Sequence, residues 1–166
     1  MKETLQNEIA SLVPRLRRFA YALSGSREEG DDIVQMACVK ALSRLDQFQP
    51  GSRLDSWMFQ IVRNQFLDER RRRARHGAPV DPDTASALSD GGLGAARGED
   101  RLTLEAVRRA MAGLPAEQRE VLALVAIEGA SYKDAAETLR LPVGTVMSRL
   151  ARARARLADL RREAGA

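Results

Sequence analysis

The sequence predicts an all-α fold of two small helical domains joined by a flexible linker. Alanine, leucine and arginine dominate the 166 residues and favour helices, whereas aromatic residues make up only 4%. Apolar residues recur at steps of three and four, and no stretch shows the alternation of a half-buried strand. This patterning stops at residues 76–100, which are rich in Gly, Ala, Pro, Ser and Asp. Because such a long loop is unusual within one domain, we expect domains at 1–75 and 101–166 and a linker at 76–100.

The first domain is expected to contain three helical stretches. The first is apolar at Leu5, Ile9, Leu12, Leu16, Phe19 and Leu23, on one helix or on two helices broken near Pro14. The second carries its apolar face at Val34, Ala37, Cys38, Ala41, Leu45 and Phe48. The third is predicted from about Leu54 to Arg75, with apolar positions Trp57, Met58, Ile61, Val62, Phe66 and Leu67.

The second domain is predicted to hold four helices. One starts near Arg101 and stops at "GLP", and the next stops at "EGAS". A short helix, "YKDAAETL", then leads through the turn "RLPVG" into a long helix that ends near Arg162. A short helix, a tight turn and a second helix form the helix-turn-helix pattern of DNA-binding proteins, although a basic amphipathic hairpin would show the same spacing.

Positive charge is concentrated in two places. The net charge is +4, and seven arginines lie between Arg140 and Arg162 against one acid, Asp159. On the last predicted helix, one face carries Val146, Leu150, Ala153, Leu157 and Leu160, and the opposite face carries Ser148, Ala151, Arg152 and Ala155. Small residues with arginines beside them suit a helix that enters a major groove. The second basic run, Arg70–Arg73, indicates backbone contacts to nucleic acid or a solvated helix end.

Several classes of function are disfavoured by what the sequence lacks. Its one cysteine and one histidine cannot build a His/Cys metal cluster, and there is no Gly-rich phosphate loop or Ser/His/Asp set. Cys38 falls on an apolar face and is expected to be a core residue. No signal peptide or membrane-spanning stretch is apparent. We therefore expect a cytoplasmic, non-enzymatic protein without a cofactor, a metal or a membrane insertion.

Two motif sets resemble the sigma-70 family of RNA polymerase sigma factors. The tract "LPAEQREVLALVAIEGASYKDAAETLRLPVGTVMSRLARARARL" is similar to region 4 of the extracytoplasmic-function (ECF) group. The tracts "DDIVQMACVKALSRLDQF" and "SWMFQIVRNQFLDERRRRAR" resemble the polymerase-binding helix and the promoter-melting segment of region 2. The stretch "FQPGSRLDSWMFQIVRN" is also similar to the general-stress ECF group of alphaproteobacteria.

The resemblance implies a protein that binds RNA polymerase core and directs promoter-specific initiation. Region 4 would contact the upstream (−35) element through Thr145, Met147, Ser148, Arg149 and Arg152. Thr145 could instead cap the helix. Region 2 would hold the melted −10 element through Phe48, Ser52, Arg53, Trp57, Arg63, Asn64, Arg70 and Arg71. Trp57 is instead expected to be a core residue, since large aromatic side chains prefer burial, with support of the pocket from behind as the alternative.

The resemblance also implies protein partners. Asp31, Asp32 and Gln35 would contact the polymerase core, whose clamp and flap on the large subunits are the expected docking sites; acids in a first helical turn also stabilise the helix itself. An anti-sigma factor is the expected regulator. Three positions depart from the family pattern: Met147 is often basic in relatives, Arg140 often Gly, and Ala135 often a bulkier aliphatic. If the turn needs positive φ, Arg140 costs about a kcal/mol.

Three other functions remain open from the sequence. A stand-alone helix-turn-helix regulator would explain the second domain, would leave the first unexplained, and would need to dimerise. An antagonist carrying a sigma-like domain would bind partners without supporting transcription. An enzyme is the poorest of the three, because no catalytic constellation is present.

Overall fold

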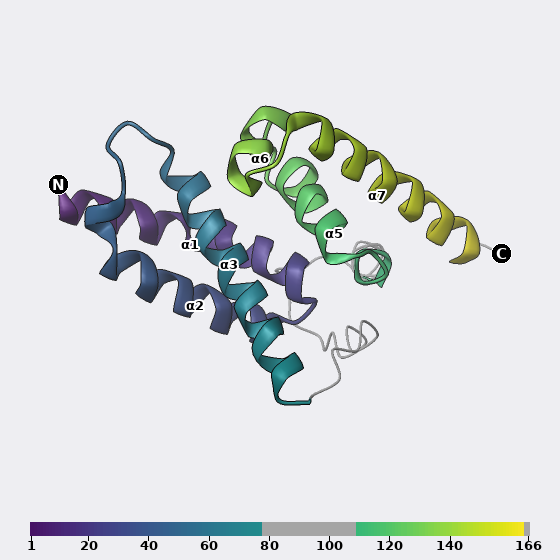
Figure 1. The fold of residues 1–166 in the computed structure, drawn as a ribbon, viewed down its shortest axis with the longest axis horizontal. Coiled ribbons are helices and arrows are strands. Elements are labelled where there is room, and N and C mark those ends of the chain that lie inside the picture. The colour runs from purple at the N-terminus through teal and green to yellow at the C-terminus, as the bar shows by residue number, and fades with distance from the viewer. Residues whose placement is uncertain (78–108, 165–166) are drawn as a thin grey trace, which may run out of the picture.

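The computed structural model describes residues 1–77 and 109–164, and these residues form helices with no strand. Figure 1 shows two groups of helices, which we call the N-terminal block (residues 1–77) and the C-terminal block (residues 109–164). The elements are α1 (Lys2–Ser24), α2 (Arg27–Ser43), the 3-10 turn η1 (Leu45–Gln47), α3 (Leu54–Arg75), α5 (Ala116–Leu122), the π-helical turn η3 (Ala123–Ile127), α6 (Tyr132–Leu139) and α7 (Val143–Ala164). The predicted all-α fold is confirmed. Residues 78–100 of the predicted linker and the start of the fourth predicted helix lie outside the described residues, so the domain boundaries stay a prediction.

The N-terminal block is a bundle of α1, α2 and α3. Of the two interpretations at Pro14, the structure has the single helix, because α1 continues through this exposed proline to Ser24. Gly25 ends α1 with φ 73°, a left-handed conformation that glycine adopts without strain. Ser26 then begins α2, where its Oγ accepts a hydrogen bond from the Glu29 backbone N–H at 3.3 Å.

Close packing holds these three helices together. The rings of Phe19 on α1 and Phe59 on α3 meet edge to face at 5.1 Å between centroids. A Cβ at Gly30 would lie 2.4 Å from Cδ1 of Tyr21, so only glycine allows α2 to approach α1 this closely. The prediction that Leu45 and Phe48 continue the face of the second helix is wrong, because α2 ends at Ser43 and Leu45 packs into the core from η1.

The C-terminal block is built around the helix-turn-helix pair α6 and α7. Ala135 and Ala136 are buried where the two helices cross, as their small size predicts, and Val146 and Leu150 of α7 are buried beside them. Arg140 ends α6 with φ 55° and ψ 47°, so the strained turn expected at this position is confirmed. Ser131 caps α6 by accepting a 3.0 Å hydrogen bond from the Asp134 backbone N–H.

The two blocks are packed against each other. Helix α3 lies beside α6, and α1 lies beside α5 and η3, whereas α7 runs along the outer side of the C-terminal block (Figure 1). This arrangement decides which predicted DNA-binding residues face solvent. Among the described helices, none is both long and apolar enough to cross a membrane.

Candidate nucleic-acid interface

The first half of α7 presents a row of small and basic side chains to solvent. Ser148, Ala151, Arg152 and Ala155 are all exposed, whereas Val146, Leu150 and Ala153 are buried against the block. The predicted division of this helix into a packed face and an outward face is therefore confirmed. Arg152 forms no ion pair with any described residue, so its guanidinium is available to a phosphate or a guanine edge.

The other predicted −35 residues surround this row. Met147 is 51% exposed, although a side chain of this size is usually buried. Thr145 lies within the first turn, because α7 begins at Val143, and its backbone carbonyl accepts a hydrogen bond from Ser148 Oγ at 3.1 Å. Arg149 is held at the edge of the row by Glu117 of α5, with 3.4 Å between Nη2 and the carboxylate. The Glu117 side chain is 59% exposed, so this pair lies at the surface.

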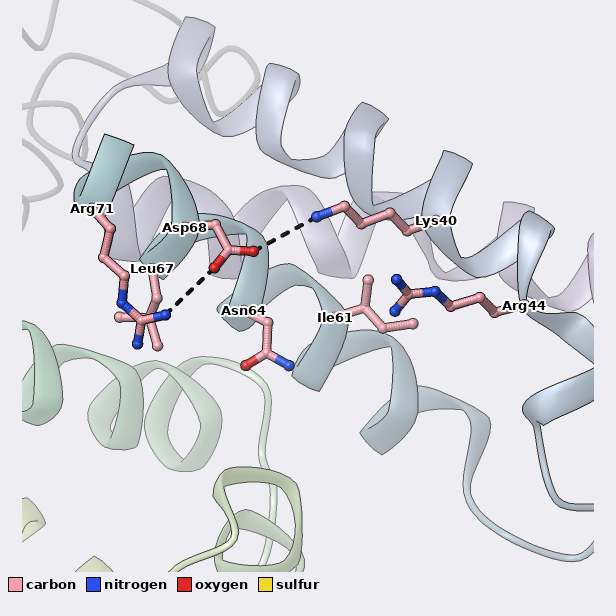
Figure 2. Close-up of a pocket in the computed structure, with 7 residues that line it drawn as sticks. All are labelled: Lys40, Arg44, Ile61, Asn64, Leu67, Asp68 and Arg71. Carbon is pink, nitrogen blue, oxygen red and sulfur yellow. Dashed lines mark ion pairs between the residues drawn. The ribbon is translucent and has the colours of Figure 1, made fainter. Parts of the chain in front are cut away.

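A second candidate surface is a groove between α2 and α3. It has a volume of about 310 Å³ and is lined by Lys40, Arg44, Ile61, Asn64, Leu67, Asp68 and Arg71. Figure 2 shows Asp68 between Lys40 and Arg71, with ion-pair distances of 3.7 and 3.6 Å. This volume is at the small end of the range for ligand sites and suits one or two nucleotides better than a duplex.

The groove combines three kinds of group that a single strand needs. Lys40, Arg44 and Arg71 are cations that can meet phosphates once a strand takes the place of Asp68 beside Lys40 and Arg71, and the Asn64 amide can pair with a base edge. Ile61 and Leu67 give an apolar floor for a sugar or a base. Asn64 and Arg71 were predicted from the sequence, but Lys40 and Arg44 were not. Their spacing of four residues along the predicted second helix was the available signal, although α2 ends at Ser43 and Arg44 directly follows it.

The loop before α3 and the first turn of α3 contain the aromatic part of the predicted −10 pocket. Phe48 and Trp57 are both half-buried, with ring centroids 5.4 Å apart. Trp57 packs on the core, as one of its two alternatives predicted, and its support of a pocket stays a prediction. Ser52 is exposed, and its Oγ donates to the Gln49 carbonyl at 2.6 Å, which stabilises the turn.

Arg53 and Arg63 both pair with carboxylates of the C-terminal block, although the Arg53 side chain remains 45% exposed. Arg53 hydrogen-bonds Asp55 at 2.8 Å and also pairs with Asp134 of α6; these bonds raise its pKa above the ordinary arginine value. Arg63 makes a two-pronged contact with Glu120 of α5, with nitrogen–oxygen distances of 2.7 and 3.3 Å. The structure thus separates these two residues from Asn64 and Arg71, with which they were grouped.

The basic run at the end of α3 does not act as one unit. The Arg70 guanidinium stacks 4.8 Å from the Phe66 ring centroid, and burial lowers its pKa. Arg72 and Arg73 pair with Glu69 and Glu29 at 3.7 and 2.9 Å. Of Arg70 and Arg71, the two that were assigned to the −10 element, only Arg71 lines the groove.

The predicted polymerase-binding residues lie together on α2. Asp31 accepts a 2.6 Å hydrogen bond from the Tyr21 hydroxyl and lies 3.6 Å from Arg17, so part of its role is to tie α2 to α1. Asp32 and Gln35 are exposed and line a further cavity of about 310 Å³ between α2 and α3. A partner can therefore reach Asp32 and Gln35 without displacing contacts within the protein.

An apolar stripe on α2 was not identified from the sequence. Met36, Val39 and Leu42 are 45%, 56% and 45% exposed, and their spacing of three residues places them along one side of the helix. They lie beside Gln35 and out of phase with the buried face. The sequence did offer a signal, because these apolar residues fall outside the predicted core face of the helix. A contiguous exposed apolar stripe is a candidate protein-binding surface.

Comparison with protein families matches both blocks in the expected order. Residues 9–76 match Sigma-70 region 2, and residues 104–157 match Sigma-70, region 4. A relative in Rhodopseudomonas palustris (strain TIE-1), the ECF RNA polymerase sigma factor EcfG, is 42% identical over 161 residues, which cover 96% of this chain and 86% of that protein.

Two solved structures are similar along almost the whole chain. One is the sigma factor RpoE from Bartonella quintana in complex with the anti-sigma factor NepR, with a TM-score of 0.78, 32% identity and 98% of each chain covered. The other is CnrH in complex with the cytosolic domain of CnrY, with a TM-score of 0.70, 28% identity, and coverage of 96% of this chain and 88% of that one. The similarity therefore includes the way the two blocks are packed together.

Proposed function

This chain belongs to the ECF group of the sigma-70 family, and from that premise we propose which of its surfaces bind each part of a promoter and of the polymerase. It binds RNA polymerase core and directs promoter-specific initiation, and its similarity to EcfG and RpoE is of the general-stress type. The residue assignment rests on one observation. The chain has two positively charged surfaces of different shape, a protruding helix face on α7 and a narrow groove between α2 and α3.

Helix α7 binds the −35 element as duplex. The outward row around Ser148, Ala151 and Arg152 is shallow enough to let the helix enter a major groove. Arg152 and Arg149 supply charge for phosphates or guanine, and Met147 offers an apolar contact to a thymine methyl. Thr145 lies in the first turn and helps to set the position of Ser148 through the hydrogen bond between them.

The groove of the N-terminal block holds the melted −10 element. A single strand can enter a space that a duplex cannot, and the backbone charge of such a strand matches Lys40, Arg44 and Arg71. Asn64 pairs with a base edge inside the groove, and the loop carrying Phe48 and Ser52 receives an unstacked base beside it. Arg53 and Arg63 join this surface once they leave their carboxylate partners.

Helix α2 is the docking surface for the polymerase core. Met36, Val39 and Leu42 provide an apolar stripe, and Asp32 and Gln35 provide polar contacts along its side. A partner helix could cover both at once. Asp31 supports this surface indirectly, through its bonds to α1.

The remaining assignments follow from this role. Sigma factors are non-enzymatic initiation factors, and we propose that this chain has no catalytic activity of its own and works in the cytoplasm, where polymerase is. A stand-alone helix-turn-helix regulator is not favoured, because the N-terminal block matches region 2. An anti-sigma factor is a partner of this chain, as NepR is for RpoE of Bartonella quintana.

The decisive experiment is transcription by purified core polymerase, with and without this protein, on genomic fragments. We expect initiation at a discrete set of sites only when the protein is present, and the mapped start sites give both promoter elements. The variant Val39→Glu should abolish initiation and co-elution with core, because it places a charge in the apolar stripe. The matched variant Ala158→Glu, on the far part of α7, should leave both unchanged. Normal co-elution of Val39→Glu would contradict the assignment of α2.

A further inference from the structure

The cavity that Asp32 and Gln35 line is separate from the groove assigned to the −10 strand. Both lie between α2 and α3, but the two share no lining residue. We call the second one the Gln65 cavity. Its volume of about 310 Å³ is enough for a small ligand and too small for a folded peptide segment. Its charged and buried polar groups are Glu29 and Asp32 of α2 and Gln65, Glu69, Arg72 and Arg73 of α3.

Gln65 is the buried polar side chain in the wall of this cavity. The residue is 4% exposed, and its Nε2 donates a 3.3 Å hydrogen bond to Oε1 of Glu69. Its own Oε1 has no hydrogen-bond partner. Turning the amide over would bring this oxygen against the Glu69 carboxylate, so that two acceptors faced each other. Glu69 therefore fixes the amide with its oxygen unpaired, and a buried acceptor in that state destabilises the protein until a donor reaches it.

The charges around the cavity leave one carboxylate without a partner. Arg73 pairs with Glu29 at 2.9 Å, and this pair connects the end of α3 to α2. Arg72 lies 3.7 Å from Glu69. Asp32 is exposed and forms no ion pair with any described residue. The cavity thus has one uncompensated negative charge and one unpaired neutral acceptor, which together match a cation with several N–H donors.

We propose that the Gln65 cavity binds one small organic cation, a guanidinium group on a short alkyl stem. A guanidinium has five N–H donors in a plane, so it can bond the Asp32 carboxylate and Oε1 of Gln65 at the same time. It is more weakly hydrated than an ammonium and enters a half-enclosed site more readily. The alkyl stem packs on Ile33 and Met36, which form the apolar part of the wall.

An occupied cavity changes the surface that we assign to the polymerase core. Asp32 and Gln35 line the cavity, and Met36 belongs to the apolar stripe of α2. A bound guanidinium neutralises Asp32 and places its stem beside the stripe, so the cation and the core compete for the same residues. This competition rests on the proposed function, because it needs core to dock on α2. Binding of the cation itself does not.

Binding can be tested by NMR on the full chain with n-propylguanidinium as the probe. We expect saturable shifts of the Gln65 side-chain amide signals and of backbone amides near Asp32 and Glu69, with a Kd of about 1 mM for so few ligand atoms. Neutral n-propylurea should give no saturable shift, and n-butylammonium should bind more weakly. Equal binding of the urea, or saturable shifts that avoid these residues, would overturn the proposal. Equal binding of the ammonium would overturn the choice of a guanidinium.

Variants of the two unpaired acceptors test the site directly. Asp32→Asn removes the exposed carboxylate and should weaken binding of n-propylguanidinium about tenfold, the effect of one charge-assisted hydrogen bond. Asp46→Asn removes an exposed carboxylate outside the cavity and should leave binding unchanged. Unchanged helicity by circular dichroism would show that both variants are folded. Equal affinities of the two variants would exclude Asp32 from the site and overturn the proposal.

Gln65→Met keeps the length of the side chain and removes its amide. Binding of n-propylguanidinium should again fall about tenfold. The melting temperature of the free protein should not fall, because the substitution also removes the buried acceptor that has no partner. A lower melting temperature with unchanged binding would show that Gln65 has a structural role only, and it would overturn the site.

The competition is tested by the affinity of the chain for core polymerase. n-Propylguanidinium at about ten times its Kd should weaken core binding by the wild-type chain about tenfold, and sodium chloride at the same concentration should not. Core binding by Gln65→Met should respond much less to the cation. A saturated cavity with unchanged core affinity would overturn the competition and leave the site standing. Failure of the wild-type chain to bind core without the cation would instead count against the proposed function, and the NMR result would be unaffected.

Discussion

Helices α3 and α7 both carry arginines predicted to contact DNA, but the structure leaves these arginines in different states. Arg152 on α7 faces solvent, and no described residue pairs with it. Arg63 on α3 is held by the buried carboxylate of Glu120. Both arginines belong to basic amphipathic helices, so the difference arises from what packs opposite each helix. Position on a basic helix therefore does not by itself make an arginine available for binding.

The largest effect is expected from a negative charge placed in the outward row of α7. Ala151→Glu puts a carboxylate in the outward row of α7, where it would face the phosphates or acceptor groups of the −35 element. We expect a loss of about a hundredfold or more in promoter-specific initiation, measured with core polymerase on a mapped promoter. Ala158→Glu carries the same charge farther along α7 and should have little effect. Equal losses in the two variants would remove α7 as the recognition helix.

A smaller loss is expected from removing one donor of the same surface. Arg152→Ala should weaken binding to the −35 element by about 1–3 kcal/mol, because it deletes a contact to a guanine or a phosphate. Arg156→Ala, outside the proposed set, should weaken it less. Mobility shifts of the polymerase complex on duplexes altered at single −35 positions would show whether Arg152 discriminates bases. If Arg156→Ala cost more, the register of α7 in the groove would have to be revised.

The groove of the N-terminal block should respond mainly through salt dependence. Lys40→Ala with Arg44→Ala removes two cations, and each lost phosphate contact should reduce the slope of log affinity against log salt by about 0.7 for a single strand. This slope can be measured by titrating a fluorescent oligothymidine strand with the protein at several salt concentrations. Lys2→Ala with Arg161→Ala removes the same charge elsewhere on the surface. If both double variants changed the slope equally, the net charge of the protein, and not the groove, would attract the strand.

The smallest effect is expected on stability, from a substitution in the turn between α6 and α7. Arg140→Gly should stabilise the C-terminal block by about 1 kcal/mol, since glycine adopts φ 55° without the strain of a side chain. Arg140→Ala removes the guanidinium but retains the Cβ, so it should not show this gain. Thermal unfolding followed by circular dichroism measures both variants. Equal stabilisation by alanine would attribute the effect to lost charge.

The sequence predicted those features that depend on neighbours along the chain. The spacing of apolar residues placed the third helix at Leu54–Arg75 and the faces of the last helix correctly. The strain at Arg140 followed from the local demands of a tight turn. The resemblance to the family indicated which positions would contact the promoter, and these assignments remain proposals.

The features that the sequence did not predict depend on packing between distant segments. Arg63 and Glu120 are 57 positions apart, and Arg15 and Glu128 are 113 apart, so no local pattern connects them. Lys40 and Arg44 join Asn64 and Arg71 only because α2 lies beside α3. Met36, Val39 and Leu42 are recognisable as a surface only once the buried face of α2 is known.

The π-helical turn η3 has a consequence for insertions and deletions in this part of the chain. In η3 the backbone N–H of Glu128 bonds the Ala123 carbonyl, five residues back, at 3.0 Å. An α-helical turn holds one residue fewer, and one residue corresponds to about 100° of rotation around the axis. Deleting the exposed Ala126 would therefore leave Glu128 four residues after Ala123, the spacing of an α-helical hydrogen bond, and Glu128 would keep its direction toward Arg15 and Arg18. The extra residue of η3 can thus be lost without turning the carboxylate away from the neighbouring block.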